Sequence, residues 1–357
     1  MSAGEKTGAS AKMSADARMR AWQLPAGCTS IDQAELVELP RPAPAAGEVL
    51  VRVRATSLNY RDQAIARGVY FGRAIPVAGI PLSDGAGVVE AVGPGVEAFA
   101  AGDRVAGTFF QGWEDGPPPA NKGDTLGCPP AKGMLADYVT LPESGVVKLA
   151  TSLSFEEAAT LPCAGVTAWN ALMMGQRPLE RGQSVLLIGT GGVSVLALRI
   201  AKAAGARVIA TSSSDTKLTR MRQLGADATV NYRSEAQWGV RAAELAGGGI
   251  DHVVEVGGLG TLAQSIQAVG FGGEIELIGV LTMKGEANPM PLMVKGATLR
   301  GIFVGPAAMA RALNTFIDQH ALKPVIDRVF TFADAKAAYA YQSSGELFGK
   351  VVIANPA

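Results

Sequence analysis

The chain has 357 residues, and its 32 basic and 32 acidic side chains cancel to a formal net charge of zero. Hydrophobic residues make up 48% and charged residues 18%, which is enough apolar material for a large core and, at this length, for two domains. The neutral balance argues against a nucleic-acid-binding protein, and the lack of a long apolar run predicts no membrane span.

The N-terminal segment and the cysteines bear on the compartment. Residues 1–18 are small and polar and lack the apolar centre of a secretory signal, so we expect a disordered tail there. Cys28, Cys128 and Cys163 are widely spaced and form no disulfide framework, which favours a reducing compartment. We therefore expect a cytoplasmic protein.

The next part of the chain, up to about residue 148, has the pattern of a β-rich domain. Short alternating runs are interrupted by Gly and Pro, and a Gly- and Pro-rich segment at 111–133 predicts a long loop. Strands are expected at 49–55, 87–92, 103–107 and 138–140.

From residue 155 onward the pattern changes to alternating helices and strands. After a helical segment at 155–174, apolar strands are expected at 184–188, 207–211, 228–230, 252–256, 274–280 and 298–304. Helices are expected at 193–204, 217–224, 235–245, 261–269 and 308–322, and a last strand at 349–354. This alternation is typical of βαβ units, so the sequence predicts an α/β fold with a doubly wound parallel sheet.

The strongest chemical signal is a glycine-rich turn between an apolar strand and a helix, Gly189-Thr190-Gly191-Gly192-Val193-Ser194. Glycine lets the backbone approach a pyrophosphate, and the helix N-terminus offers amide groups and a positive dipole end. Ser194 replaces the usual third glycine, which serves helix–strand packing. The alternative is a turn without a ligand, but the surrounding βα alternation favours dinucleotide binding.

The second strand of the unit indicates which nicotinamide cofactor is bound. It ends at Thr211, Ser212, Ser213 and Ser214 without the acidic residue that would hold the ribose 2′-hydroxyl of NAD. Serine hydroxyls and the nearby Lys217 can bind a 2′-phosphate, so we expect NADP(H). Two alternatives stay open, because Asp215 is an acid close to this point and Lys217 could simply belong to a solvated helix face.

With these residues identified, the chain resembles a zinc-independent member of the medium-chain dehydrogenase/reductase superfamily, in its quinone oxidoreductase branch. The motifs that carry the resemblance are Ser57-Leu58-Asn59-Tyr60-Arg61-Asp62, Gly85-Ala86-Gly87-Val88-Val89-Glu90-Ala91-Val92-Gly93, Gly102-Asp103-Arg104-Val105, Leu161-Pro162-Cys163-Ala164-Gly165-Val166-Thr167-Ala168, Leu224-Gly225-Ala226-Asp227, Asn231-Tyr232-Arg233 and Gly349-Lys350-Val351-Val352. The resemblance implies a GroES-like catalytic domain interrupted by a Rossmann domain. The expected limits are 1–18 for the tail, 19–148 with 305–357 for the catalytic domain, and 149–304 for the NADP-binding domain.

The resemblance also bears on metal binding. The positions that hold catalytic zinc in related alcohol dehydrogenases are Asn59, Ser83 and Cys163 here, and one thiolate cannot make a three-ligand site. Only Cys128 falls in the region of a structural zinc lobe, so we expect no metal. Cys163 is then expected to be a small packing residue, with a reactive thiol as the alternative.

Without a Lewis acid, reduction of a quinone or of an α,β-unsaturated carbonyl is the easier reaction, because it needs only orientation and hydrogen-bond donors near the carbonyl oxygen. The candidate donors are Asn59, Tyr60, Tyr70 and Ser83, although the two tyrosines could also be wall residues. The resemblance implies that Asn59 lies beside the nicotinamide ribose or the substrate and that Tyr70 matches a pocket tyrosine.

The long loop carries a cluster of aromatic residues. Phe109, Phe110 and Trp113, with Gln111, suggest a lid over a flat apolar substrate. The alternative is a loop that is pinned by its own aromatic side chains.

The resemblance implies further cofactor contacts, at Thr167, Tyr232, Gly257, Gly279, Phe303, Val304 and Lys350. One departure is Pro306-Ala307, where relatives carry Ser-Arg; it removes a polar contact at the cofactor end or at the hinge between the domains. His252 and His320 are expected to be structural.

The leading hypothesis is a metal-free, NADPH-dependent reductase of quinones or α,β-unsaturated carbonyls. The alternatives are a zinc-independent alcohol or aldehyde dehydrogenase and a non-catalytic NADPH-binding sensor or structural protein. The strand at 298–304 is expected at the edge of the sheet, where two copies could pair, so we expect a homodimer.

Overall fold

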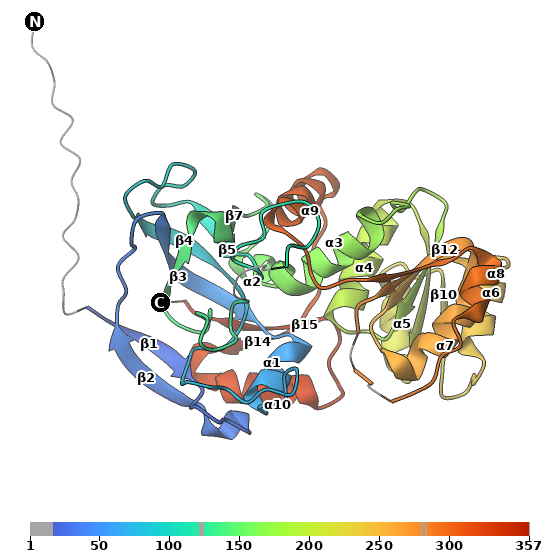
Figure 1. Ribbon diagram of the computed structural model, residues 1–357, viewed down its shortest axis with the longest axis horizontal. Helices are drawn as coiled ribbons and strands as arrows, with labels where there is room; N and C mark the ends of the chain where they lie inside the picture. The colour runs from blue at the N-terminus through green and yellow to red at the C-terminus, as the bar shows by residue number, and fades with distance from the viewer. Residues whose placement is uncertain (1–16, 121–124, 280, 283, 357) are drawn as a thin grey trace, which may run out of the picture.

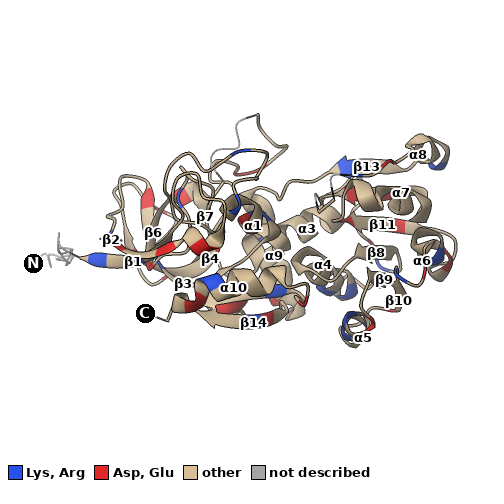
Figure 2. Cartoon of the chain, turned by 90° about the horizontal axis from the view of Figure 1, so that it is seen from below, with Lys and Arg blue, Asp and Glu red and all other residues tan. Residues whose placement is uncertain are grey.

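The computed structural model describes residues 17–120, 125–279, 281, 282 and 284–356. In this part of the chain the protein has two lobes, and each lobe is built around its own β-sheet (Figure 1). None of the helices in it is both long and apolar enough to cross a membrane. Figure 2 shows basic and acidic residues interspersed along both lobes.

The first lobe contains strands from both ends of the chain. Its strands are β1 (Arg18–Gln23), β2 (Glu35–Pro40), β3 (Glu48–Ser57), β4 (Asp84–Val92), β5 (Arg104–Gly107), β6 (Tyr138–Pro142), β7 (Val146–Lys148), β14 (Ile326–Thr331) and β15 (Lys350–Ala354). The main sheet has the order β14-β15-β3-β4-β5-β7, with β6 paired to β3, while β1 and β2 form a separate pair. The end of the chain therefore returns to the first sheet, because β15 pairs antiparallel with β3.

The second lobe contains the parallel sheet that the sequence predicts. Its strands are β8 (Ser184–Ile188), β9 (Arg207–Ser212), β10 (Ala228–Asn231), β11 (Ile250–Glu255), β12 (Val269–Leu277) and β13 (Thr298–Gly301). The order is β10-β9-β8-β11-β12-β13, and every pair is parallel. The direction of strand addition reverses between β8 and β11, which is where ligands bind in open α/β sheets. The α/β class and the doubly wound sheet are confirmed.

Helices cover the sheets and join the lobes. They are α1 (Tyr60–Ala66), α2 (Phe155–Ala158), α3 (Val166–Met173), α4 (Gly192–Ala203), α5 (Asp215–Gln223), α6 (Trp238–Ala246), α7 (Leu259–Ala268), α8 (Met290–Lys295), α9 (Ala307–His320) and α10 (Ala335–Ser343). Short turns of other helix types lie at Ile31–Gln33, Glu143–Gly145, Leu161–Gly165 and Phe332–Asp334.

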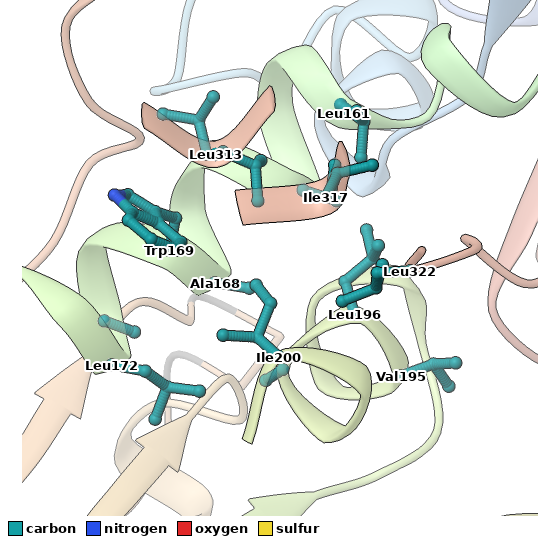
Figure 3. Close-up of a cluster of buried hydrophobic side chains, with 14 of the residues drawn as sticks. Leu161, Ala168, Trp169, Leu172, Val195, Leu196, Ile200, Leu313, Ile317 and Leu322 are labelled. Atoms are coloured by element: carbon teal, nitrogen blue, oxygen red, sulfur yellow. The ribbon is translucent and has the colours of Figure 1, made fainter. Parts of the chain in front are cut away.

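The largest hydrophobic core runs through both lobes. In Figure 3, Trp169 of α3 lies near Leu313 of α9, and Leu172 of α3 lies near Ile200 of α4. Helix α9 follows the second sheet in sequence but packs on α3 and on β7 of the first. Burial of these apolar faces therefore holds the two lobes together.

Several boundaries differ from the prediction. Arg18 already belongs to β1, so the expected tail does not reach residue 18; residues 1–16 of it lie outside the described part. Helix α1 was not predicted and begins at a capping box formed by Asn59 and Asp62. Strand β13 ends at Gly301 instead of residue 304, because Val304 has a φ of 56°, which an extended strand cannot contain. The domain limits themselves stay a prediction.

Candidate functional site

The glycine-rich turn follows β8 directly and opens α4. Gly189 has a φ of 73°, a left-handed conformation that favours glycine, and its amide donates to the Thr211 carbonyl oxygen at 3.0 Å. A Cβ added at Gly191 would meet nothing within 4 Å, so open space lies in front of this backbone. The first amides of α4 have no acceptor within the helix, which makes the turn suitable for a phosphate.

Ser194 performs the packing role expected of it. Its side chain is buried, and its hydroxyl donates to the Ile188 carbonyl oxygen at 2.7 Å, which ties the first turn of α4 back to β8. Serine can therefore replace the usual glycine here without obstructing the open side of the turn.

The turn also touches the end of the first lobe. The Gly349 amide donates to the Thr190 carbonyl oxygen at 2.9 Å, and Gly191 forms an isolated bridge with Gly349. A Cβ at Gly192 would come within 2.6 Å of Cδ of Lys350. The phosphate turn and strand β15 are therefore in direct contact.

Hydroxyl groups surround the end of β9, as expected. Ser212 is buried and its hydroxyl accepts from the Ser214 amide, whereas Ser213 is partly exposed. Ser214 caps α5 by accepting from the Lys217 amide at 3.4 Å. Tyr232 follows β10 and lies beside this region, because its amide donates to the Ser212 carbonyl oxygen. The residue is 41% exposed.

Two charged groups near this point are engaged. The ammonium of Lys217 donates to the Gly345 carbonyl oxygen at 2.5 Å, and burial lowers its pKa. The carboxylate of Asp215 accepts from the Asn231 side chain at 2.8 Å. Lys217 thus already has an acceptor in the opposite lobe, and it would have to leave it to bind a 2′-phosphate.

Loops after β11 and β12 meet at the carboxyl edge of the sheet. The buried Glu255 carboxylate accepts from the amides of Gly257 and Gly258 at 2.7 and 3.0 Å. A Cβ at Gly279 would lie 1.6 Å from the Val256 carbonyl oxygen, so only glycine allows this approach. Gly279 thus packs against the segment that leads to Gly257, and the cofactor contacts expected of both glycines stay a prediction. Glu255 was not predicted from the sequence, where the available signal is an acid at the end of an apolar strand.

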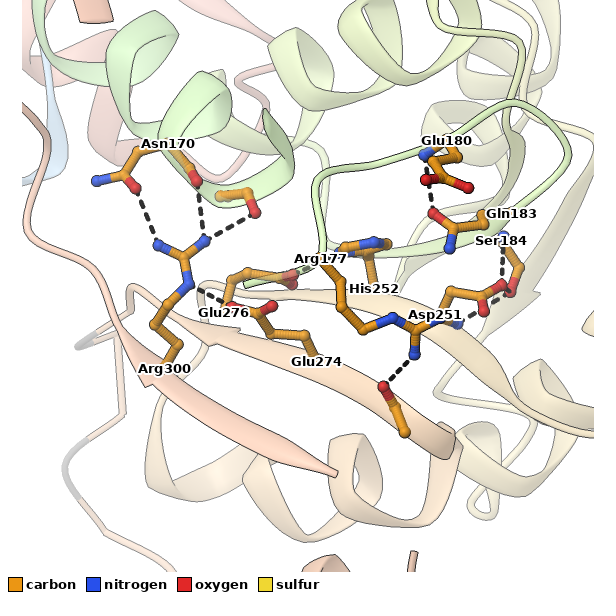
Figure 4. A network of polar contacts seen from close by, with 12 residues as sticks. Asn170, Arg177, Glu180, Gln183, Ser184, Asp251, His252, Glu274, Glu276 and Arg300 are labelled. Atoms are coloured by element: carbon orange, nitrogen blue, oxygen red, sulfur yellow. Dashed lines mark hydrogen bonds and ion pairs between the residues drawn. The ribbon is translucent and has the colours of Figure 1, made fainter. Parts of the chain in front are cut away.

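Segment 303–305, after β13, is held by a polar network that includes Asn170 and Arg300. Asn170 of α3 donates through Nδ2 to the Val304 carbonyl oxygen at 2.6 Å. Arg300 donates to Asn170 Oδ1 at 2.9 Å, as Figure 4 shows. The Arg300 guanidinium also pairs with buried Glu274. A β-branched residue at positive φ is strained, so this network over-determines the backbone at Val304. Sequence reasoning did not single out Asn170 or Arg300.

Residues of the first lobe form a buried polar cluster, which we call the Lys350 cluster: Asn59, Ser83, Asp84 and Lys350. Lys350 Nζ donates to Asn59 Oδ1 at 2.6 Å and lies 3.7 Å from Asp84 Oδ2. The Ser83 hydroxyl donates to Asp84 Oδ1 at 2.9 Å and accepts from Asn59 Nδ2 at 3.4 Å. The Cys163 amide donates to Asp84 Oδ2 at 3.3 Å, and one turn later Thr167 donates to the Cys163 carbonyl oxygen at 2.7 Å.

Two charged residues, Asp62 and Arg61, lie next to Asn59 of the Lys350 cluster. Asp62 accepts from the Asn59 amide at 2.6 Å, and burial raises the pKa of this carboxyl to about 6. The buried Arg61 guanidinium donates to the Leu126 carbonyl oxygen at 2.7 Å and lies 5.0 Å from the centre of the Tyr70 ring. Burial raises the pKa of the Tyr70 hydroxyl, which therefore remains a donor at neutral pH.

The remaining predicted residues lie in different surroundings. Tyr60 is 54% exposed. Trp113 is buried, and its Nε1 donates to the Gly116 carbonyl oxygen at 3.2 Å, so the structure does not place it at the Lys350 cluster. Phe109 and Phe110 are also buried, which favours the pinned loop over the lid. Phe303 lies with its ring centre 5.2 Å from that of Phe110 and joins the lobes.

The start of α9 at Pro306-Ala307 is hydrogen-bonded to the long loop. The amides of Ala307 and Ala308 donate to the carbonyl oxygens of Trp113 and Glu114 at 3.0 and 2.9 Å. Backbone groups of the long loop thus satisfy the start of α9, and this contact needs no Ser-Arg side chains.

The donor set does not fit a zinc ion. Lys350 donates to the Asn59 oxygen, the Ser83 hydroxyl donates to Asp84, and burial raises the pKa of the Cys163 thiol well above its usual range. An ammonium group so close would also repel a cation. Within the described ranges, no group of three or more His, Cys, Asp or Glu residues could hold a metal ion. His252 pairs with buried Glu276 at 2.8 Å, in the interior of the second lobe.

Comparisons with known proteins agree with this architecture. Residues 45–151 match the alcohol dehydrogenase GroES-like domain, and residues 192–319 match the zinc-binding dehydrogenase family. A zinc-type alcohol dehydrogenase-like protein of Schizosaccharomyces pombe is 43% identical over 315 residues, which cover 86% of this chain and 90% of that protein. A 2-methylene-furan-3-one reductase of Solanum lycopersicum is 30% identical, covering 96% and 81%.

Two further likenesses complete the comparison. A quinone oxidoreductase of Rattus norvegicus is 30% identical, with coverage of 87% of this chain and 90% of its own. The crystal structure of a putative alcohol dehydrogenase from Sinorhizobium meliloti 1021 superposes with a TM-score of 0.88 at 41% identity, covering 96% and 100%. With both family regions matched, and a doubly wound sheet joined to a GroES-like lobe, the chain belongs to the medium-chain dehydrogenase/reductase family.

Proposed function

We propose that this protein is a metal-free, NADPH-dependent oxidoreductase that reduces quinones or α,β-unsaturated carbonyl compounds. The observation that carries the proposal is a glycine turn open to a pyrophosphate beside a buried cluster whose ligands do not suit zinc. The names of two relatives, a 2-methylene-furan-3-one reductase and a quinone oxidoreductase, support this substrate class.

The second lobe would hold the cofactor. When bound, NADPH supplies the hydride for the reduction. The amides of Gly189–Gly192 would bind its pyrophosphate, and the backbone at Gly257 and Gly279 would contact the ribose. Thr167, Phe303 and Val304 would lie at the nicotinamide end.

The first lobe would stabilise the charge that develops on the substrate. Addition at the β-carbon moves negative charge to the carbonyl oxygen, where a fixed hydrogen-bond donor is most effective. Asn59 Nδ2 and the Tyr70 hydroxyl are suitable donors, whereas the Ser83 hydroxyl already donates to Asp84. Solvent can then protonate the enolate, so no obligate general acid is needed.

Preference for NADPH over NADH rests on the end of β9. Ser212, Ser213, Lys217 and Tyr232 surround this end, and the acid nearest to it, Asp215, is bound by Asn231. A carboxylate free at the strand end would instead favour NADH.

A substrate panel tests the proposal. NADPH and NADH oxidation would be followed with quinones, small enones and simple aldehydes, before and after treatment with a chelator. We expect turnover of quinones or enones with NADPH that the chelator leaves unchanged. Turnover that the chelator abolishes would contradict the metal-free mechanism.

A second candidate is a zinc-independent alcohol or aldehyde dehydrogenase, favoured by the relatives named as alcohol dehydrogenases. It predicts turnover of simple aldehydes and none of enones. A sensor or structural protein would bind NADPH and leave the whole panel untouched.

Assembly, compartment and domain limits are part of the proposal. Exposed Met293, Val294 and Leu299 lie on α8 and on edge strand β13, so we propose a homodimer through this face, and a monomer in sedimentation would contradict it. We propose a cytoplasmic location, since all three cysteines are free thiols. Limited proteolysis near residues 148 and 304 would test the domain limits.

A further inference from the structure

Lys350 is a buried cation with two hydrogen-bond acceptors and a carboxylate close to it. Its side chain is 3% exposed, and Nζ donates to the Leu58 carbonyl oxygen at 2.7 Å and to Asn59 Oδ1 at 2.6 Å. The carboxylate of Asp84, which is fully buried, lies 3.7 Å away. A buried charge is stable only when it is paired and hydrogen-bonded, so these three partners fix the ammonium in place.

This contact determines which way the Asn59 amide points. An ammonium group only donates hydrogen bonds, so it must meet the oxygen of the amide and not the nitrogen. Nδ2 then lies on the opposite side, where it donates to Ser83 Oγ at 3.4 Å, close to the limit of a hydrogen bond. One of its two hydrogens remains to be donated to a ligand.

Lys350 is also in contact with the phosphate turn. Its Cδ approaches Gly192, and the preceding Gly349 amide binds the Thr190 carbonyl oxygen at 2.9 Å. Lys350, which contacts Asn59, therefore also packs against the backbone that would hold the pyrophosphate.

We propose that Lys350 is a positioning residue: it holds the Asn59 amide with Nδ2 directed at the substrate carbonyl oxygen, and its charge lies where a metal would lie in a zinc site. This inference rests on the proposed function. It also changes the role expected of Lys350, from a cofactor contact to an anchor of the substrate-side donor.

A double-mutant cycle tests the coupling. Lys350→Met keeps the length of the side chain and removes its donors, and Asn59→Ala removes the amide. Loss of one such donor costs about 100- to 1000-fold in kcat. We expect each single variant to lose activity on this scale and the double variant to be no worse than the weaker single one. Multiplying losses would overturn the proposal.

Asn59→Asp separates orientation from donation. The new carboxylate can still accept from Lys350 but has no hydrogens to donate, so we expect unchanged NADPH affinity with kcat reduced about 100-fold. Wild-type kcat in this variant would refute the role of Nδ2. Partial recovery in Lys350→Arg relative to Lys350→Met is also expected, because arginine keeps the charge and donors.

A matched control is Lys295→Met. Lys295 Nζ donates to the carbonyl oxygens of Ile266, Gln267 and Val269 at 3.0, 3.0 and 2.7 Å, far from the Lys350 cluster. We expect this variant to lose stability while kcat stays unchanged. An equal loss of kcat in both lysine variants would point to a general structural effect and contradict positioning.

A readout on the protein without cofactor separates this inference from the proposed function. The Asn59 side-chain amide resonance, assigned by its loss in Asn59→Asp, should move in Lys350→Met and stay in place in Lys295→Met. An unmoved resonance would overturn the inference even in an active enzyme. If the resonance moves but the wild type oxidises no NADPH with any substrate, the proposed function fails and the orientation of Asn59 by Lys350 stands.

Discussion

The two halves of the candidate site differ in that one is formed by backbone and the other by side chains. The cofactor half consists of backbone at the ends of β8, β11 and β12: Gly191 faces open space, whereas Gly257 and Gly279 allow close packing. The substrate half, the Lys350 cluster, consists of buried side chains from α1, β4, β15 and their flanking residues. A site made of backbone should tolerate changes that keep its space clear, whereas a site made of paired side chains should fail when any one partner is removed.

Filling the open space at Gly191 should have the largest effect. A valine there meets no protein atom at its Cβ, so Gly191→Val should fold normally while its side chain enters the pyrophosphate space. We expect the Kd for NADPH to rise about a thousandfold, equivalent to roughly 4 kcal/mol. Fluorescence titration measures this, and Gly191→Ala should show a smaller rise. Unchanged affinity in Gly191→Val would place the cofactor elsewhere.

The buried ion pair between Arg300 and Glu274 should have the next largest effect. Arg300→Leu leaves Glu274 buried without its partner, and we expect a loss of about 3 kcal/mol in the free energy of unfolding. Arg241→Leu is the matched control, because its pair with Glu244 is about half exposed and should contribute less than about 1 kcal/mol. Urea denaturation compares them, and similar losses in the two variants would contradict the role of the buried pair.

The buried acid beside that pair should make stability depend on pH. Burial raises the pKa of Glu276 to about 7 in the folded protein, above the ordinary value of 4.5, so the folded state keeps a proton that the unfolded state releases. The contribution of this group to stability therefore falls as the pH rises from 4.5 to 7, by on the order of 2 kcal/mol. Urea midpoints at pH 5 and pH 8 should differ less in Glu276→Gln than in the wild type; an equal difference would argue against the shift.

Substitution of Lys217, at the edge of the cofactor half, should have the smallest effect. Lys217 already donates to the Gly345 carbonyl oxygen, so its contribution to a 2′-phosphate is partly offset. We expect Lys217→Met to weaken NADPH binding about fivefold, or roughly 1 kcal/mol, and to leave NADH binding unchanged. Equal weakening of both cofactors would remove Lys217 from the 2′-phosphate site.

The same contrast explains what the sequence could predict. The turn at Gly189–Gly192 and the packing role of Ser194 are encoded within a few consecutive residues, and the structure has both. The contact between Asn59 and Lys350 joins residues 291 positions apart, and the support of Val304 by Asn170 spans 134. Such contacts depend on how the lobes pack, so local patterns could name Asn59 and Lys350 as candidates but could not pair them.

Single-turnover reduction with metal analysis tests the central claim most directly. Wild-type protein of measured metal content would be mixed with stoichiometric NADPH and a quinone or enone, and loss of NADPH absorbance recorded. We expect complete turnover in protein that holds far less than one metal ion per chain. A turnover that rises and falls with bound zinc would contradict the proposed metal-free site, in which Lys350 is the buried cation.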